Sequence, residues 1–171
     1  MTLPILIIGC GRSGTQYTAK LLTECGLDIG HEREGADGEA NWMKTPNGRG
    51  LRLHQKRNAL KVIASCTTFG DISWRIISEH IPLYPEESIL KKCMKYYYFW
   101  NMIAERNTVF SYYVEQLPEI WDKFCEVIGH SLTYRDIPKN INTRQGEYPA
   151  LSWRDLERED PILCRLIRKQ C

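Results

Sequence analysis

The chain has 171 residues, of which 43% are hydrophobic and 26% are charged, and its formal net charge is +2. A chain of this length can bury roughly 70% of the surface that it exposes when unfolded, so we expect one domain over residues 1–171. The small net charge argues against a nucleic-acid-binding surface, and the lack of a signal-peptide pattern or an apolar run of ~20 residues favours a cytoplasmic protein without a membrane span.

The first predicted element is an apolar strand that runs directly into a glycine-rich loop. Residues 3–8 are almost all aliphatic, and the sequence GCGRSGT follows at residues 9–15. Residues 16–25 have the apolar spacing of an amphipathic helix, which Gly26 is well placed to end. A strand, a loop and a helix in this order predict a phosphate-binding loop, because curled backbone N–H groups and a helix N-terminus attract an anion.

The residues of this loop distinguish it from a Walker A loop. Gly9 and Gly14 have the Walker A spacing, but Thr15 stands in place of the lysine and Gln16 in place of the hydroxyl that holds magnesium. The cation is Arg12, inside the loop, and an arginine can contact a phosphate or sulfate bidentately without a metal. An ordinary strand-to-helix turn is the alternative, although it needs fewer glycines and hydroxyls.

The loop GCGRSGT with its following helix resembles the 5′-phosphosulfate loop of the sulfotransferases that use 3′-phosphoadenosine 5′-phosphosulfate (PAPS). In that family a lysine or arginine lies two residues before the second glycine, as Arg12 does here. Many members have a second Thr or Ser where this chain has Gln16. The resemblance implies that the 5′-phosphosulfate is bound by Gly11, Arg12, Ser13, Gly14, Thr15 and Gln16.

The next predicted elements are a short strand and a long loop. Residues 27–30 favour a strand that ends at His31 and Glu32. Residues 33–50 are rich in Gly, Asp, Glu and Asn, and Trp42 and Met43 are their only large apolar side chains. We expect a long loop here, either a lid that binds the acceptor with Trp42 as a platform, or a disordered surface loop.

A second resemblance follows at Arg57. Alternating residues at 51–56 predict a strand, and a helix containing Val62 and Ile63 comes after it. Sulfotransferases have an R-N-P-x-D-x-x-x-S pattern whose arginine and serine bind the 3′-phosphate of the nucleotide. Arg57 and Ser65 reproduce that spacing, with Ala59 and Lys61 in place of the proline and the aspartate. The resemblance therefore implies a 3′-phosphate site at Arg57 and Ser65.

The middle of the chain is predicted to be mainly helical. A helical pattern begins at Asp71 and is broken by Pro82 and Pro85, and a longer helix is expected over residues 86–106. The aromatic run at residues 96–100 could stack on a ligand, but its helical spacing favours a core contact.

The last third contains one more strand and three helices. Residues 108–114 are β-branched and aromatic, which favours a strand. Its end resembles the Y-E-D-L segment of sulfotransferases, in which Glu115 has a structural role. A helix stopped by Gly129 is expected next, then a polar segment, and two C-terminal helices that begin with a capping box at Ser152 and an N-cap at Asp160. Arg144 faintly resembles a late R-K-G element of the 3′-phosphate site; a solvated loop is the alternative.

The seven cysteines form neither a zinc site nor a complete disulfide framework, because their number is odd and they include no C-x-x-C pair. Most are expected to be small core residues. Cys10 lies inside the anion-binding loop, so it is either a thiol with a lowered pKa or a packed, inert one.

The resemblance also implies the chemistry. An acceptor hydroxyl attacks sulfur in line, and a fixed cation stabilises the charge on the departing oxygen. We expect Arg12 to be that cation. Glu32 is the first candidate for the base, since some bacterial carbohydrate sulfotransferases have a glutamate at this place, and His31 is the second. His54 has no ligand-like spacing.

The sequence thus predicts an α/β protein with a P-loop NTPase-like three-layer fold, a mainly parallel sheet and helices on both faces. It resembles a compact PAPS-dependent sulfotransferase, which implies PAPS as donor and the bisphosphate PAP as product, with no metal required. The acceptor would be a hydroxyl or amine of a small molecule, carbohydrate or lipid, and the sequence does not identify it. The alternatives are an inactive PAP-binding or PAPS-binding module, and a phosphotransferase or nucleotide hydrolase with a divergent P-loop.

Overall fold

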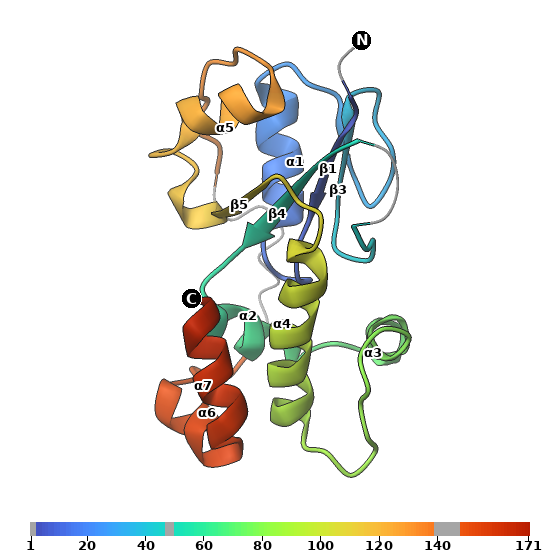
Figure 1. Cartoon of the computed structure of the whole chain (residues 1–171), viewed down its shortest axis with the longest axis vertical. Helices are drawn as coiled ribbons and strands as arrows, with labels where there is room; N and C mark the ends of the chain where they lie inside the picture. Colours follow the sequence, from blue (N-terminus) through green and yellow to red (C-terminus); the bar gives the residue numbers. More distant parts are fainter. Residues whose placement is uncertain (1–2, 47–49, 139–147) are drawn as a thin grey trace.

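The computed structural model describes residues 3–46, 50–138 and 148–171. Its centre is a five-stranded sheet with the order β2-β3-β1-β4-β5, in which every pair of neighbours is parallel. The predicted parallel sheet is therefore confirmed (Figure 1). The strands are β1 (Ile5–Ile8), β2 (Ile29–His31), β3 (Gly38–Asn41), β4 (Leu51–Lys56) and β5 (Phe110–Tyr113).

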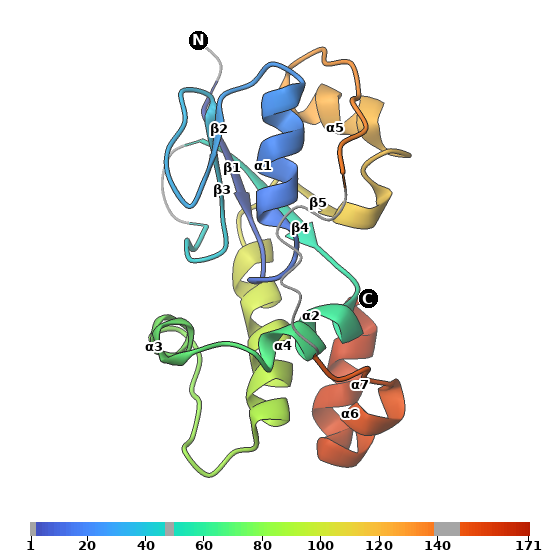
Figure 2. The ribbon, with the colours of Figure 1, turned by 180° about the vertical axis from the view of Figure 1, so that it is seen from behind.

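Helices cover both faces of the sheet, as predicted. Successive residues of a strand point to opposite faces, and Ile5 and Ile7 of β1 pack in one core with α1 (Thr15–Glu24) and α5 (Trp121–Ile128). Leu6 and Ile8 pack on the other face against Ala104 of α4 (Ile89–Glu105). Figures 1 and 2 show α1 and α5 together on one side of the strands.

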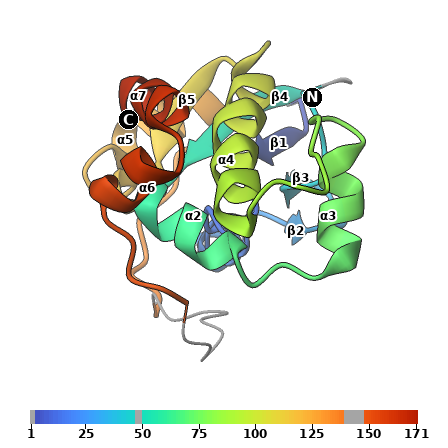
Figure 3. The ribbon, with the colours of Figure 1, turned by 90° about the horizontal axis from the view of Figure 1, so that it is seen from below.

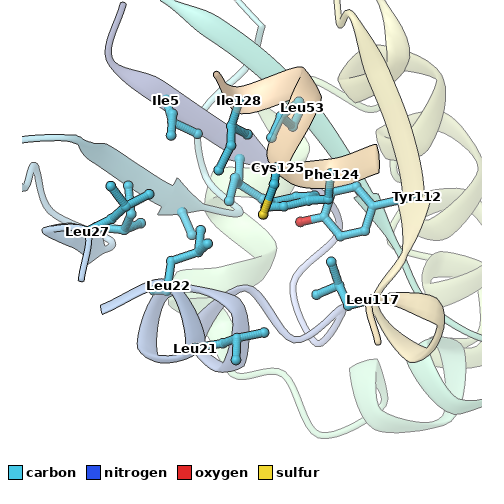
Figure 4. Close-up of a cluster of buried hydrophobic side chains, with 14 of the residues drawn as sticks. Ile5, Leu21, Leu22, Leu27, Leu53, Tyr112, Leu117, Phe124, Cys125 and Ile128 are labelled. Carbon is cyan, nitrogen blue, oxygen red and sulfur yellow. The ribbon is translucent and has the colours of Figure 1, made fainter. Parts of the chain in front are cut away.

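The core between the sheet and these two helices is made of aliphatic and aromatic side chains. Full burial of each contributes about 1.5–3 kcal/mol to stability. Figure 4 shows how side chains from β1, β4 and β5 meet those of α1 and α5, with these residues labelled: Ile5, Leu21, Leu22, Leu27, Leu53, Tyr112, Leu117, Phe124, Cys125 and Ile128.

A second core lies beyond the carboxyl ends of the strands, around the N-terminal half of α4. There α2 (Ala59–Cys66), α6 (Trp153–Glu159) and α7 (Pro161–Gln170) pack together with α4. The short helix α3 (Asp71–Ser78) lies on the opposite side of α4 from α6 and α7 (Figure 3). The molecule is thus elongated, and α4 runs through both halves.

The predicted helix ends are confirmed at the C-terminus. Ser152 and Asp155 form the capping box of α6, since each side chain bonds the backbone N–H of the other residue. Asp160 accepts two backbone N–H groups at the start of α7, where Pro161 takes the first helical position. Gly129, at φ 72°, ends α5 as expected. In the part of the chain that the structure describes, no helix is long and apolar enough to cross a membrane.

One predicted segment is wrong. Residues 33–50 are not a single long loop, because they contain β3, a buried strand between β2 and β1. β3 has the sequence GEAN, without the β-branched or aromatic residues that favour strands. Its two polar side chains, Glu39 and Asn41, are buried, and Lys44 forms an ion pair with Glu39 that offsets the cost of burying the carboxylate. Backbone pairing with β1 and β2 therefore stabilises this strand although its own residues have a weak preference for strands.

Candidate functional site

A cavity of about 610 Å³ opens at the carboxyl edge of the sheet. From β1 the chain crosses first to β2 and β3 on one side and later to β4 and β5 on the other. The crevice at such a reversal is the usual ligand site of a parallel α/β sheet. Most lining residues come from the ends of β1, β2, β3 and β4 or the segments after them, from α1, α2 and α3, and from the segment between α2 and α3; Tyr148 comes from the segment before α6. The full set is Gly11, Arg12, Gly14, Thr15, Gln16, Tyr17, His31, Glu32, Trp42, Met43, Arg57, Ser65, Thr68, Phe69, Ile72, Ser73, Ile76 and Tyr148.

The glycine-rich loop has the curled backbone that an anion site requires. Arg12 has φ 72° and Gly14 has φ 93°, so two left-handed residues flank Ser13. Such alternation turns backbone N–H groups toward one point. Helix α1 begins directly after the loop at Thr15, and its first N–H groups have no partner within the helix. The loop and the start of α1 therefore present donors to the cavity.

Backbone strain is concentrated at this cavity. In the described ranges three residues other than glycine have positive φ, namely Arg12, Glu32 and Asn107. Two of the three line the cavity. A left-handed residue other than glycine costs roughly 1–2 kcal/mol, and such strain persists where the surrounding structure over-determines it, often at functional sites.

Buried polar groups hold the loop in place from two sides. Gln55 of β4 donates through Nε2 to the Ser13 carbonyl at 2.8 Å, and its Oε1 accepts from Thr18 at 2.6 Å. From α4, the Trp100 indole donates to the Gly9 carbonyl at 3.2 Å, and the Tyr96 hydroxyl accepts the Gly11 N–H at 2.5 Å. The loop is therefore preorganised, which is what electrostatic stabilisation of an anion needs.

Arg57 connects the second predicted motif to the loop. Its Nη1 donates to the Arg12 carbonyl at 3.0 Å, and its Nε lies 3.8 Å from Glu115 Oε1. Glu115 also accepts the backbone N–H of Asn58 at 3.2 Å, which confirms the structural role predicted for it. Ser65 lies on α2 and lines the same cavity as Arg57. Arg57 and Ser65, eight positions apart in the chain, thus line the same cavity.

His31 and Glu32 lie side by side at the end of β2. His31 Nε2 is 3.3 Å from Thr15 Oγ1 and 3.7 Å from Glu32 Oε1. Glu32 accepts a hydrogen bond from the Trp42 indole at 2.7 Å. Burial lowers the pKa of His31, and the neighbouring Glu32 charge opposes that shift. His31 is therefore neutral at neutral pH and able to take a proton, while Glu32 would stabilise the resulting imidazolium.

Aromatic rings form a wall beside Arg12. Its guanidinium carbon lies 5.1 Å from the centre of the Phe69 ring, in a cation–π contact. Phe69 stacks on Trp42 with 5.8 Å between ring centres and 23° between planes. The arginine that the sequence indicated for catalysis is thus positioned by an aromatic side chain from the segment after α2.

Most predicted site residues meet in this one cavity. Those that line it are Gly11, Arg12, Gly14, Thr15, Gln16, His31, Glu32, Arg57 and Ser65. Ser13 does not line it, because its side chain is buried beside Gly9 and only 1% of the residue is exposed. Arg144 lies outside the described residues. Within the described ranges, no three His, Cys, Asp or Glu side chains form a group that could hold a metal ion.

Cys10 is packed beneath the loop. The residue is 1% exposed, and its thiol lies 3.7 Å from the Tyr97 carbonyl. Burial raises the pKa of this thiol well above its usual value, which favours the inert of the two interpretations. The aromatic run of α4 is likewise a core element, since Tyr96, Tyr97 and Trp100 are buried.

Several site residues were not indicated by the sequence. Phe69, Ile72 and Ile76 line the cavity from the segment after α2 and from α3. Gln55 and Tyr96 support the loop from elements far along the chain. Gln55 carried one weak signal, a polar side chain inside a predicted strand. The others depend on how α3 and α4 pack, which no local pattern specifies.

Comparison of the chain with protein-family models, with curated proteins and with solved structures finds no match in any of the three. What the cavity binds must therefore be inferred from its own residues.

Proposed function

We propose that the chain is a PAPS-dependent sulfotransferase with a P-loop NTPase-like fold, which moves a sulfuryl group to a hydroxyl or amine. The observation that carries the proposal is the meeting of two sequence motifs in one cavity. Arg57 and Ser65 lie 45 or more positions after Arg12 in the chain, yet all three line the same space. Two anion sites in one cavity suit a nucleotide that carries charge at both its 5′ and its 3′ positions.

The 5′-phosphosulfate would lie in the loop, against the N–H groups at the start of α1 and the Arg12 guanidinium. Arg57 and Ser65 would bind the 3′-phosphate. The Arg57 side chain is 35% exposed and only 3.8 Å from Glu115, so part of its charge is already compensated. An added phosphate would compete with Glu115 for this arginine, and its two charges favour the phosphate.

The transfer step needs charge stabilisation more than covalent assistance. The acceptor oxygen forms a bond to sulfur, the bond between sulfur and the bridging 5′-phosphate oxygen breaks, and the electron pair leaves with PAP. Arg12 would stabilise the charge that builds on this oxygen. His31, neutral and 3.7 Å from Glu32, would take the acceptor proton, and the Glu32 carboxylate would stabilise the protonated ring.

Thermal unfolding tests donor binding. PAP at 100 times its Kd should add about 2.7 kcal/mol of stability without magnesium, or roughly 5–10 °C in Tm for a chain of this size. ATP without magnesium should give no comparable shift. Stabilisation by ATP with magnesium and none by PAP would instead indicate a phosphotransferase or nucleotide hydrolase. PAP binding without transfer to any acceptor would indicate a binding module.

Variants locate the two anion sites. Arg12→Gln should abolish the Tm shift caused by PAP. Arg57→Gln should weaken PAP about 10- to 100-fold, the loss expected for one charged hydrogen bond, and leave the affinity for adenosine 5′-monophosphate nearly unchanged. Lys61→Gln is the matched control, because Lys61 is an exposed cation on α2 that does not line the cavity. An equal effect of both substitutions would show that only the net charge matters.

A further inference from the structure

One wall of the cavity, formed by α3 and the segment before it, is apolar. Ile72 and Ile76 are four positions apart on α3, so they share a face of that helix, and both line the cavity. The next residue, Ile77, is buried in the second core and anchors α3. Ile72 is 69% exposed. Its side chain adds apolar surface to the cavity wall, and such linings are typical of small-molecule sites.

The aromatic part of this wall is held rigidly. Phe69 stacks on Trp42 and also meets Trp74 edge-on, at 5.7 Å between ring centres. The Trp42 indole is fixed in turn by its hydrogen bond to Glu32, and the Trp74 indole donates to the Phe69 carbonyl at 3.2 Å. Rings fixed in this way provide a preformed apolar surface.

The apolar wall continues directly into the groups assigned to proton transfer. Trp42 contacts Glu32, Glu32 lies beside His31, and Phe69 lies beneath Arg12. A molecule that rests on Trp42 and Phe69 is therefore next to both the base and the sulfuryl group. In the proposed reaction only the acceptor has to touch both.

We infer, on the basis of the proposed function, that the acceptor is an uncharged phenol or other apolar alcohol whose body lies on Trp42, Phe69, Ile72 and Ile76. Its hydroxyl would face His31, which takes the proton as the new O–S bond forms, and PAP leaves with the electron pair. The products are an organic sulfate monoester and PAP.

The same wall disfavours a sugar or an anionic acceptor. The polar side chains that α2, α3 and the segment between them add to the lining are the hydroxyls of Ser65, Thr68 and Ser73, and Ser65 is assigned to the donor. The many hydroxyls of a sugar would lose water against isoleucine and phenylalanine without gaining partners. Among the described lining residues the lysines and arginines are only Arg12 and Arg57, both assigned to the donor, so no further cation there would bind an acceptor anion.

Acceptor use can be measured with 2-naphthol and N-acetylglucosamine as probes and labelled PAPS as donor. Naphthol should be sulfated with a KM at least 10-fold below that of the sugar. Calorimetric titration of naphthol into protein saturated with PAP should show binding as well. Ile72→Gln and Ile76→Gln should each raise the KM for naphthol about 10-fold, without changing the Kd for PAP.

Ile162→Gln is the matched control, because Ile162 is 66% exposed on α7 and does not line the cavity. This substitution should change neither the KM for naphthol nor the Kd for PAP. PAP binding together with transfer to the sugar in preference to naphthol would overturn the assignment of the acceptor and leave the donor site standing. Failure of PAP to bind, even with naphthol bound, would overturn the proposed function itself and the acceptor role with it.

Discussion

Replacing Tyr96 by phenylalanine tests whether α4 holds the phosphate loop in its curled form. The Tyr96 ring is fully buried, and its hydroxyl accepts the Gly11 N–H at 2.5 Å. Phenylalanine keeps the ring and its contacts with Phe69 and Trp100, whose ring centres lie 5.8 and 5.5 Å away. The substitution therefore removes one oxygen and leaves a buried N–H group without an acceptor.

An unsatisfied buried donor costs about 1–3 kcal/mol, so the free energy of unfolding should fall by about 2 kcal/mol. Urea unfolding followed by circular dichroism would measure this loss at constant m-value. Tyr98→Phe is the control on the same helix, because Tyr98 is only partly buried and its hydroxyl makes no hydrogen bond to the described residues. It should stay within ~0.5 kcal/mol of the natural chain. If both variants lose the same free energy, the Tyr96 hydroxyl does not support the loop.

Two further predictions concern the loop and the sheet beneath it. A Cβ atom at Gly9 would lie 2.2 Å from the backbone oxygen of Gln55, so Gly9→Ala should cost roughly 1–3 kcal/mol in urea unfolding. Gly70→Ala puts the new carbon more than 4 Å from other atoms, so it should cost less, at most about 1 kcal/mol, because Gly70 is the N-cap of α3 and alanine is a poor cap. Equal losses would contradict the close approach at Gly9. Burial lowers the pKa of His54, so below about pH 6.5 the unfolded chain binds more protons than the folded one. The free energy of unfolding should therefore decrease as the pH is lowered through this range. Urea midpoints at pH 7.5 and 5.5 should therefore differ less for His54→Gln than for the natural chain, and an unchanged difference would contradict this.

The fold was predictable wherever a local pattern was strong. The aliphatic run of β1, the spacing of α1 and the caps at Ser152 and Asp160 each point to one structure and are confirmed. β3 was missed because its four residues have no strand preference of their own. A strand of this kind is stabilised by backbone pairing with β1 and β2 on either side and by the Lys44 ion pair, and those partners are visible only after folding.

The cavity also has one part that a local sequence pattern predicts, the glycine-rich loop, and one part that only packing determines, the apolar wall. An anion site depends on backbone curvature, glycines and a helix start, all of which lie within the few residues 9–15, so its position can be read from the sequence. The apolar wall depends on where α3 lies relative to the loop, and Ile72 in the sequence looks like any other core residue of an amphipathic helix. Its 69% exposure on the cavity side reverses that interpretation. The loop residues of the proposed donor site are thus local in sequence, whereas the residues proposed to select the acceptor are brought beside Arg12 and His31 only by packing.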